Sequence, residues 1–397
     1  MNADVVVVGG GVVGSSVAYQ LKRAEPGLRV VVVERDPSYA GASSNLAMGG
    51  VRQQFATATN IQLARWSAAF YARFDQLMSE GGHCSQAWFR RRGYLFLVDH
   101  ASAATFDERL ELQRALGAAV EKWSVDDLRA RLPGLLVDDL AFGVFGPRDG
   151  YANPSQVLRS FRAGAEHRGA EYVHGEVVEI ERHAGRVRAA RVALVGGGDL
   201  RVEAGAVVNA AGAYAARVGG AAGLELPIRA QRQHLFRAAL PGPFPYRFPM
   251  VIDPGGAHWR HDDAIRPGEA DCIVVARTRF DEPFGENLEC DVPRWESDFR
   301  PPLVRRMPAL ADARMVHGWA GLYEMTPDHN PLLGEHPELG GFYVAAGFSG
   351  HGLMLAPATG LAVAEMIRHG AARTFDVSAF APDRFARGAL VHDAATL

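Results

Sequence analysis

The residues near the start of the chain combine a glycine pattern with a carboxylate at a fixed spacing. Gly9-x-Gly11-x-x-Gly14 directly follows the apolar run at residues 5–8, which is typical of a central parallel strand. Such glycines allow a tight turn and close helix packing, and the helix amino terminus faces a pyrophosphate. Glu34 ends a second apolar run, where its carboxylate can accept hydrogen bonds from ribose hydroxyls. The sequence therefore predicts a dinucleotide site, for either FAD or NAD.

The elements expected to position these residues change in kind along the chain. In order, the sequence predicts a glycine- and serine-rich loop at 41–50, a helix at 59–80, a helix starting at Pro154, a β meander at 177–203, a strand at 206–209, and a final strand and helix between 342 and 368. Residues 227–316 are rich in proline, aromatic residues and short β-like runs. They lack βαβ alternation, which predicts an antiparallel sheet in a second domain.

Composition excludes several other classes of protein. With 397 residues, a net charge of −3 and no basic block, the chain is not expected to bind nucleic acid or an anionic membrane surface. No apolar run is long enough to span a bilayer, and the first strand leaves no room for a signal peptide, so we expect a cytoplasmic protein. The cysteines and the run at 258–263 match no metal-ligand spacing. We expect no metal site and interpret that run as a hydrated hairpin tip.

Four further stretches carry glycine and aromatic residues in distinctive patterns. They are GASSNLAMGG (41–50), VVNAAGAYA (207–215), GWAGLYEMTPDHNPLLG (318–334) and FYVAAGFSGHGLMLAPATG (342–360). With the amino-terminal motif they closely resemble the D-amino-acid-oxidase superfamily of flavoproteins, in the family's order and over nearly the full length. Within this superfamily the chain resembles the branch that contains glycine oxidase, monomeric sarcosine oxidase and the β-subunits of sarcosine and proline dehydrogenases.

This resemblance implies FAD in an extended conformation and an α/β fold. A Rossmann-type FAD-binding domain would be interleaved with a substrate domain built on a mostly antiparallel β-sheet. The FAD-binding domain would comprise residues 1–82, 147–222 and 317–397, and the substrate domain residues 83–146 and 223–316.

The resemblance also implies which residues contact the cofactor. The AMP half would lie at Gly9, Gly11, Gly14, Glu34 and Arg35, with Val177 meeting the adenine through its main chain. Val12 and Val13 would also contact the cofactor. Pyrophosphate or ribityl oxygens would lie at Ser43 and Ser44, and further contacts would come from Gly49, Gly50, Ala211, Gly212, Gly350, His351, Gly352, Leu353 and Met354. Residues 350–354 precede or begin a helix, so their amides and the positive end of that helix would face the N1/C2 edge of the flavin.

On the substrate side, Tyr323 matches the tyrosine that sarcosine oxidase places over the flavin. Gly321 stands where that enzyme has its flavin-linking cysteine, and the loop at 41–50 has no histidine. We therefore expect noncovalent FAD. Met354 and Val274 stand where sarcosine oxidase has lysines for carboxylate binding and oxygen activation.

We call the glycine- and serine-rich loop at 41–50 the flavin loop. Arg52 directly follows it and is the remaining cation expected near the flavin ring. A guanidinium binds a carboxylate through two parallel hydrogen bonds, which would orient an amino acid. A structural ion pair or a pyrophosphate contact is an equal alternative. His258 could line the same cavity, so the candidate catalytic residues are Arg52, Tyr323, His351 and His258.

We therefore expect FAD-dependent oxidation of the C–N bond of an amino acid or N-alkyl amino acid, with hydride passing to flavin N5 and an imine as product. No lysine follows Lys122, which favours a dehydrogenase with a partner subunit or another electron acceptor over an oxidase. Two alternatives stay open. One is oxidation of a hydroxy acid or glycerol phosphate. The other is a non-enzymatic FAD-binding protein, because GGVRQQF and GFSGHGL also resemble assembly factors of respiratory complex I.

Overall fold

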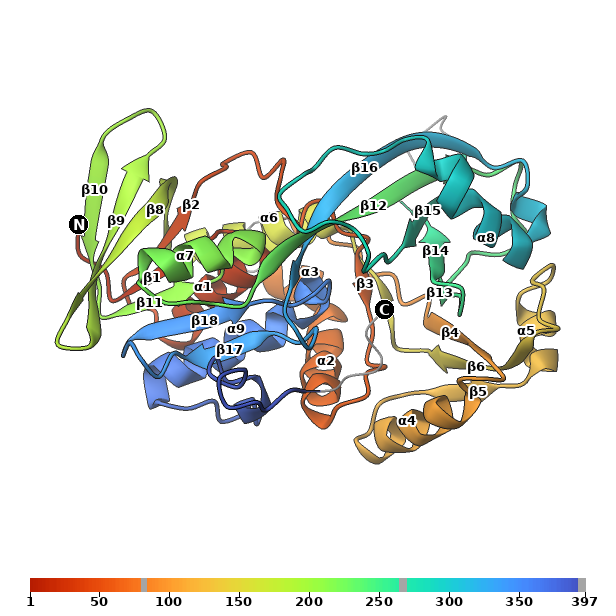
Figure 1. Ribbon diagram of the computed structural model, residues 1–397, viewed down its shortest axis with the longest axis horizontal. Coiled ribbons are helices and arrows are strands. Elements are labelled where there is room, and N and C mark those ends of the chain that lie inside the picture. Colours follow the sequence, from red (N-terminus) through yellow and green to blue (C-terminus); the bar gives the residue numbers. More distant parts are fainter. Residues whose placement is uncertain (80–83, 264–269, 392–397) are drawn as a thin grey trace.

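The computed structural model describes residues 1–79, 84–263 and 270–391. Two eight-stranded sheets occupy the two halves of the molecule (Figure 1). A two-stranded sheet, β3 (Gly50–Val51) with β7 (Gly150–Tyr151), accompanies them. The predicted α/β class is confirmed.

The first sheet has a parallel core formed by the valine-rich runs. Across the sheet its strands are β10 (Asp199–Glu203), β9 (Arg186–Leu194), β8 (Glu171–His183), β2 (Val30–Glu34), β1 (Val5–Val8), β11 (Ala206–Asn209), β18 (Phe342–Ala346) and β17 (Leu332–Glu335). The strands from β8 to β18 in this order run parallel. Every residue of β1, β2, β11 and β18 is buried, as expected of strands covered on both faces.

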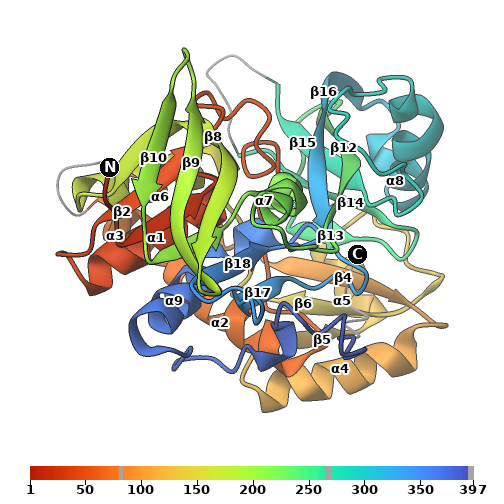
Figure 2. The same ribbon diagram turned by 60° about the vertical axis from the view of Figure 1, so that its left-hand side comes forward.

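Helices and the meander cover this sheet. The helices α1 (Val12–Ala24), α2 (Ala58–Tyr71), α6 (Pro154–His167) and α9 (Gly352–His369) pack against one another. On the opposite side α7 (Ala215–Ala221) packs against β8, and Figure 2 shows β8, β9 and β10 standing together as a meander. α6 begins where the sequence predicts, because the Asn153 side chain caps the amide of Gln156.

The helix expected over residues 59–80 is interrupted. α2 ends at Tyr71, and a short helix, α3 (Phe74–Met78), begins after Arg73, whose φ of −119° lies outside the helical region. The break brings Phe74 onto Phe161 of α6, with ring centroids 4.9 Å apart. Aromatic packing in the core therefore outweighs helix continuation. The glycines expected to end this helix lie outside the described residues.

The second sheet is antiparallel except for one pair, as the sequence predicts. Its strands in order are β16 (Arg314–Met325), β12 (Arg229–Ala239), β15 (Cys272–Arg277), β14 (Ala257–His261), β13 (Met250–Ile252), β4 (Tyr94–Asp99), β6 (Leu140–Gly146) and β5 (Glu121–Trp123). Only β13 and β4 run parallel among these described strands. The helices α4 (Ala103–Ala115), α5 (Val125–Arg131) and α8 (Arg300–Arg306) flank it (Figure 1).

The prediction of a hydrated hairpin tip at residues 258–263 is wrong for most of the run. Residues 257–261 form the buried strand β14, and the side chains of Trp259 and His261 are fully buried. His261 Nδ1 accepts a hydrogen bond from the amide of Phe248 at 2.6 Å. The polar composition suggested exposure, whereas pairing with β13 and β15 places the run inside the sheet.

The sequence predicts neither a membrane-spanning helix nor a metal site, and both can be examined over residues 1–79, 84–263 and 270–391. Within those ranges no helix is long and apolar enough to cross a membrane, and no group of histidine, cysteine or acidic residues is arranged to hold a metal ion.

The domain boundaries stay a prediction. β16 pairs with β12 in the second sheet although most of it falls in the range expected for the FAD-binding domain.

Candidate cofactor and substrate site

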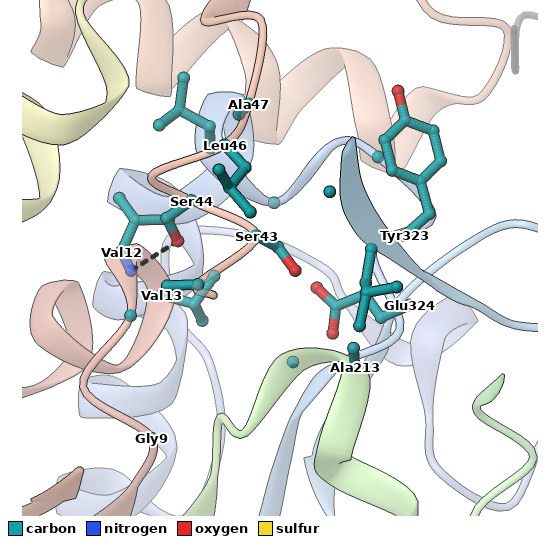
Figure 3. A pocket seen from close by; sticks show the side chains of 18 of the residues that line it. Gly9, Val12, Val13, Ser43, Ser44, Leu46, Ala47, Ala213, Tyr323 and Glu324 are labelled. Carbon is teal, nitrogen blue, oxygen red and sulfur yellow. Dashed lines mark hydrogen bonds between the residues drawn. The ribbon is translucent and has the colours of Figure 1, made fainter. Parts of the chain in front are cut away.

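A large cavity runs from the carboxyl ends of β1 and β2 to the inner strands of the second sheet. Its lining includes all predicted cofactor and catalytic residues except Gly14. Figure 3 shows a part of it, with Val12, Ser43 and Ser44 on one side and Tyr323 and Glu324 on the other. The structure thus brings together residues that are far apart in the sequence.

The glycine motif forms the turn between β1 and α1. Gly9 has a φ of +96°, and a Cβ there would lie 2.5 Å from the carbonyl oxygen of Ala210. Gly14 faces away from the cavity, and a Cβ there would overlap the carbonyl oxygen of Gly9. Its role in this structure is close packing of α1 on β1, as the third glycine of such motifs provides.

Glu34 is held firmly at one end of the cavity. Its Oε2 accepts a hydrogen bond from the amide of Gly10 at 2.7 Å, and its Oε1 accepts one from the amide of Asp36 at 2.8 Å. Burial raises the pKa of the Glu34 carboxyl, and these two amides oppose that shift. Next to it, the Arg35 guanidinium carbon lies 3.4 Å from the centroid of the Tyr214 ring.

The amino terminus of α1 faces the middle of the cavity. Its first residue, Val12, donates its amide hydrogen to the hydroxyl of Ser44 at 3.0 Å (Figure 3). Gly11 precedes the helix and provides no side-chain cap. Amides at a helix start have no partner within the helix and carry the positive end of its dipole, so this position suits an anionic pyrophosphate.

A second helix amino terminus closes the other end. α9 begins at Gly352 without a side-chain cap, and Gly352, Leu353 and Met354 all line the cavity. The loop before it turns at Gly350, whose φ is +97°. A Cβ at Gly350 would lie 2.6 Å from the Tyr323 ring, so the ring packs directly on the loop.

These features fit FAD. Two helix amino termini without side-chain caps lie along one cavity, and an oriented carboxylate lies at its far end. When bound, FAD would be held by Glu34 at its ribose, by the start of α1 at its pyrophosphate and by the start of α9 at its ring.

Arg52 lies deep in the cavity wall, with 1% of its surface exposed. Its guanidinium donates to the carbonyl oxygen of Gln54 and lies 3.1 Å from Nε2 of His351. The rings of Phe55 and Phe96 lie 4.3 and 5.2 Å from the guanidinium carbon. Because a guanidinium only donates hydrogen bonds, His351 Nε2 must accept, which places the proton of a neutral imidazole on Nδ1.

Asp149, which sequence analysis missed, fixes the segment after Arg52. Its buried carboxylate accepts hydrogen bonds from the amide and side chain of Gln53, at 3.1 and 2.7 Å, and from Gln54 at 3.2 Å. Burial raises the pKa of Asp149 to about 6. Asp149 precedes β7 and lies far from Arg52 along the chain. Its contact with this segment therefore forms only in the folded protein, and no local sequence motif marks it.

His258 reaches the cavity from β14. Its Nδ1 lies 3.2 Å from the carbonyl oxygen of Gly256 and therefore donates to it, which leaves Nε2 as an acceptor. Burial, with a further contribution from Arg52, lowers the pKa of His258 to about 4, so the ring is neutral near pH 7. Tyr94 and Met250 also line this region, and their core-like sequence context gave no signal of it.

Val274 lies behind the cavity wall. It is buried in an apolar cluster with Leu235 and Ala276, against which Met48 and Trp319 pack. Leu235, Ala276 and Met48 line the cavity, whereas Val274 does not. The cavity lining contains no lysine among the described residues.

The fold and the site define a flavoprotein with a Rossmann-type cofactor half. Residues 4–366 match the family described as DAO, FAD dependent oxidoreductase. The chain belongs to this family and binds FAD.

The similar proteins agree with this assignment. The chain is 33% identical to FAD-dependent oxidoreductase domain-containing protein 1 of Bos taurus, covering 96% of this chain and 85% of the relative. It is 26% identical to glycine oxidase of Geobacillus kaustophilus, covering 96% and 97%. The crystal structure of L-proline dehydrogenase from P. horikoshii superposes with a TM-score of 0.87 at 27% identity, covering 98% and 99%.

Proposed function

We propose that the protein oxidises the C–N bond of an amino acid or N-alkyl amino acid. The observation that carries this proposal is Arg52, a cation buried in the wall of the FAD cavity beside two imidazoles. Similarity to glycine oxidase, to the sarcosine dehydrogenases and to L-proline dehydrogenase supports the same substrate class.

In this proposal Arg52 binds the substrate carboxylate through two hydrogen bonds and fixes the position of the α-carbon. The interactions with Gln54 and His351 and the surrounding rings keep the guanidinium in place. Bound FAD supplies the hydride acceptor.

Burial in the cavity favours a neutral amine. Arg52 pairs with the substrate carboxylate, and burial in the cavity disfavours the charged form of the amine, so burial lowers the pKa of a bound ammonium group. His258 is neutral near pH 7 and adds no charge. A neutral amine has the lone pair that C–N oxidation needs, so no strongly basic residue is required. Tyr94 and Tyr323 also line this cavity.

A panel of substrates tests this proposal. The purified protein is mixed without oxygen with amino acids, N-methyl amino acids and the matching 2-hydroxy acids, and loss of the oxidised flavin absorbance is recorded. We expect reduction by members of the first two groups. Reduction by hydroxy acids alone would replace the proposed reaction with alcohol oxidation. Reduction by none of them, with a large protein partner in the purified sample, would support a non-enzymatic FAD-binding protein.

A further inference from the structure

Glu324 places a carboxyl group in the FAD cavity that the proposed reaction does not use. It is the next-to-last residue of β16 and pairs with Ala230 of β12. It is buried and lines the cavity. Figure 3 shows its carboxylate pointing into the open space between the flavin loop and η1 (Gly212–Tyr214).

The glycine loop before α9 holds one side of this carboxylate. Oε2 accepts a hydrogen bond from the amide of Gly347 at 2.8 Å, and the amide of Phe348 also donates to the group. The main-chain oxygen of Glu324 accepts from the amide of Ser349 at 3.1 Å. Oε1 faces the start of α9, where a Cβ at Gly352 would lie 3.5 Å away. One oxygen is thus fixed by the loop while the other faces the cavity.

Among the described residues, no side-chain cation forms an ion pair with this carboxylate. The titratable and charged groups on the surrounding elements are Tyr323 on β16, His351 before α9, Tyr214 in η1, Arg217 on α7, Arg52 after the flavin loop, and Arg229, Arg232, His234 and Arg237 on β12. Within the described residues none of them forms an ion pair with Glu324. Burial raises the pKa of Glu324 to about 7, although the amides of Gly347 and Phe348 oppose that shift.

FAD would make an ionised carboxylate at this position still less favourable. It brings a negatively charged pyrophosphate into the same cavity and displaces water from it, and both effects favour the neutral acid. A neutral carboxylic acid satisfies both sides of the site, because its carbonyl oxygen accepts from the loop amides and its O–H can donate into the cavity.

We propose that Glu324 is protonated in the FAD-bound protein and donates a hydrogen bond to the cofactor, so that binding of FAD takes up one proton from solvent at this residue. The proposal concerns FAD retention and does not depend on the substrate. It makes the affinity for FAD decrease as pH rises above neutrality.

The variant Glu324→Gln distinguishes the neutral from the ionised form of this carboxyl group. Its amide oxygen can accept from Gly347 and its amide nitrogen can donate into the cavity, so Glu324→Gln imitates the neutral acid at every pH. Glu324→Ala removes both functions. Glu34→Gln is the matched control, because Glu34 is the other cavity carboxylate and each of its oxygens already accepts a backbone amide.

Diluting each holoprotein and measuring released FAD by its fluorescence gives Kd from about one pH unit below to about two units above the Glu324 pKa. We expect the wild-type Kd to rise above pH 7, approaching about tenfold per pH unit. Glu324→Gln should bind FAD with little pH dependence, Glu324→Ala should bind it weakly throughout, and Glu34→Gln should weaken binding but keep the wild-type slope.

Calorimetry provides a readout that needs no variant. Titrating FAD into stripped wild-type protein, in two buffers with different ionisation enthalpies, gives the number of protons taken up. We expect about one proton at a pH one unit above the Glu324 pKa, and a correspondingly smaller uptake for Glu324→Gln. A wild-type affinity that is constant or rises with pH, or no proton uptake, would overturn the proposal. Binding by Glu324→Gln as weak as by Glu324→Ala would show that the ionised carboxylate is the binding form.

Discussion

The guanidinium of Arg52 lies 3.1 Å from Nε2 of His351, although 299 positions separate the two residues in the chain. Arg52 follows the flavin loop and His351 precedes α9, so this contact joins two segments that surround the ring end of the cavity. It also fixes the tautomer of the imidazole, because the guanidinium can only donate.

Arg52→Met removes the cation that would bind the substrate carboxylate. Loss of a hydrogen-bonded charge pair costs about 1.5–3 kcal/mol, so KM for a carboxylate-bearing substrate should rise roughly tenfold to a hundredfold. The FAD content should change little. Steady-state kinetics and the ratio of flavin to protein absorbance measure both quantities. Arg52→Lys keeps the charge but not the planar guanidinium, so its KM should lie between the KM of the wild type and the KM of Arg52→Met. Loss of flavin from Arg52→Met would instead assign Arg52 to the cofactor.

Glu34→Ala should weaken FAD binding by about 1.5–3 kcal/mol, because hydrogen bonds from ribose hydroxyls to a carboxylate are charge-assisted. The fold should persist, which circular dichroism can check. Titration of the stripped protein with FAD measures the loss. An unchanged affinity would remove Glu34 from the cofactor site.

The flavin should be released entirely as free FAD by acid or heat. Gly321 lines the cavity where a related enzyme has a flavin-linking cysteine, and the loop at 41–50 contains no histidine. A denaturing gel viewed under ultraviolet light tests this. Fluorescence that migrates with the polypeptide would contradict noncovalent binding.

The pKa of Glu324 also predicts how stability varies with pH. Burial raises this pKa from 4.5 to about 7, so between these values the folded protein holds a proton that the unfolded chain has released. Stability of the FAD-free protein should therefore fall as pH rises through this window. At 1.36 kcal/mol per pKa unit, the fall attributable to this group should be about 3 kcal/mol. Urea unfolding of wild type and Glu324→Gln at several pH values measures it, and parallel pH profiles would contradict it.

Reduced flavin should react slowly with oxygen. Electron transfer to oxygen is faster when a nearby cation stabilises the developing superoxide. The lysine that does this in sarcosine oxidase matches Val274, which lies in an apolar cluster behind the wall. Arg52 would be neutralised by the substrate or product carboxylate. Stopped-flow reoxidation in air-saturated buffer should be slower than turnover with a dye or quinone. Reoxidation as fast as turnover, with stoichiometric hydrogen peroxide, would identify an oxidase.

The cofactor end could be predicted because phosphate and ribose recognition uses backbone geometry at fixed spacing. Gly9, Gly11 and Glu34 follow valine runs whose burial leaves few alternatives. The substrate end depends instead on how the second sheet packs over the flavin loop. Tyr94 and Met250 occupy strands whose sequences look like any buried strand.

The burial of polar residues inside a sheet depends on strand pairing that the local sequence does not encode. The His258 strand resembled an exposed turn, because composition alone does not show that both of its neighbours are strands. Glu324 directly follows Tyr323 in the motif at 318–334, and its contact with the Gly347 loop depends on the folded structure. Asp149 acts on Arg52 through Gln53 and Gln54, a contact between distant segments that no local pattern encodes.

The most direct test of amino acid oxidation is anaerobic stopped-flow reduction of the bound flavin. The best amino acid from the panel is compared with the same compound lacking its carboxylate and with the same compound deuterated at the α-carbon. We predict rapid flavin reduction by the amino acid, a primary isotope effect on that step, and reduction by the decarboxylated amine slower by roughly the factor lost in Arg52→Met. Equal rates with and without the carboxylate, or no reduction by any amino or N-alkyl amino acid, would contradict the proposed function.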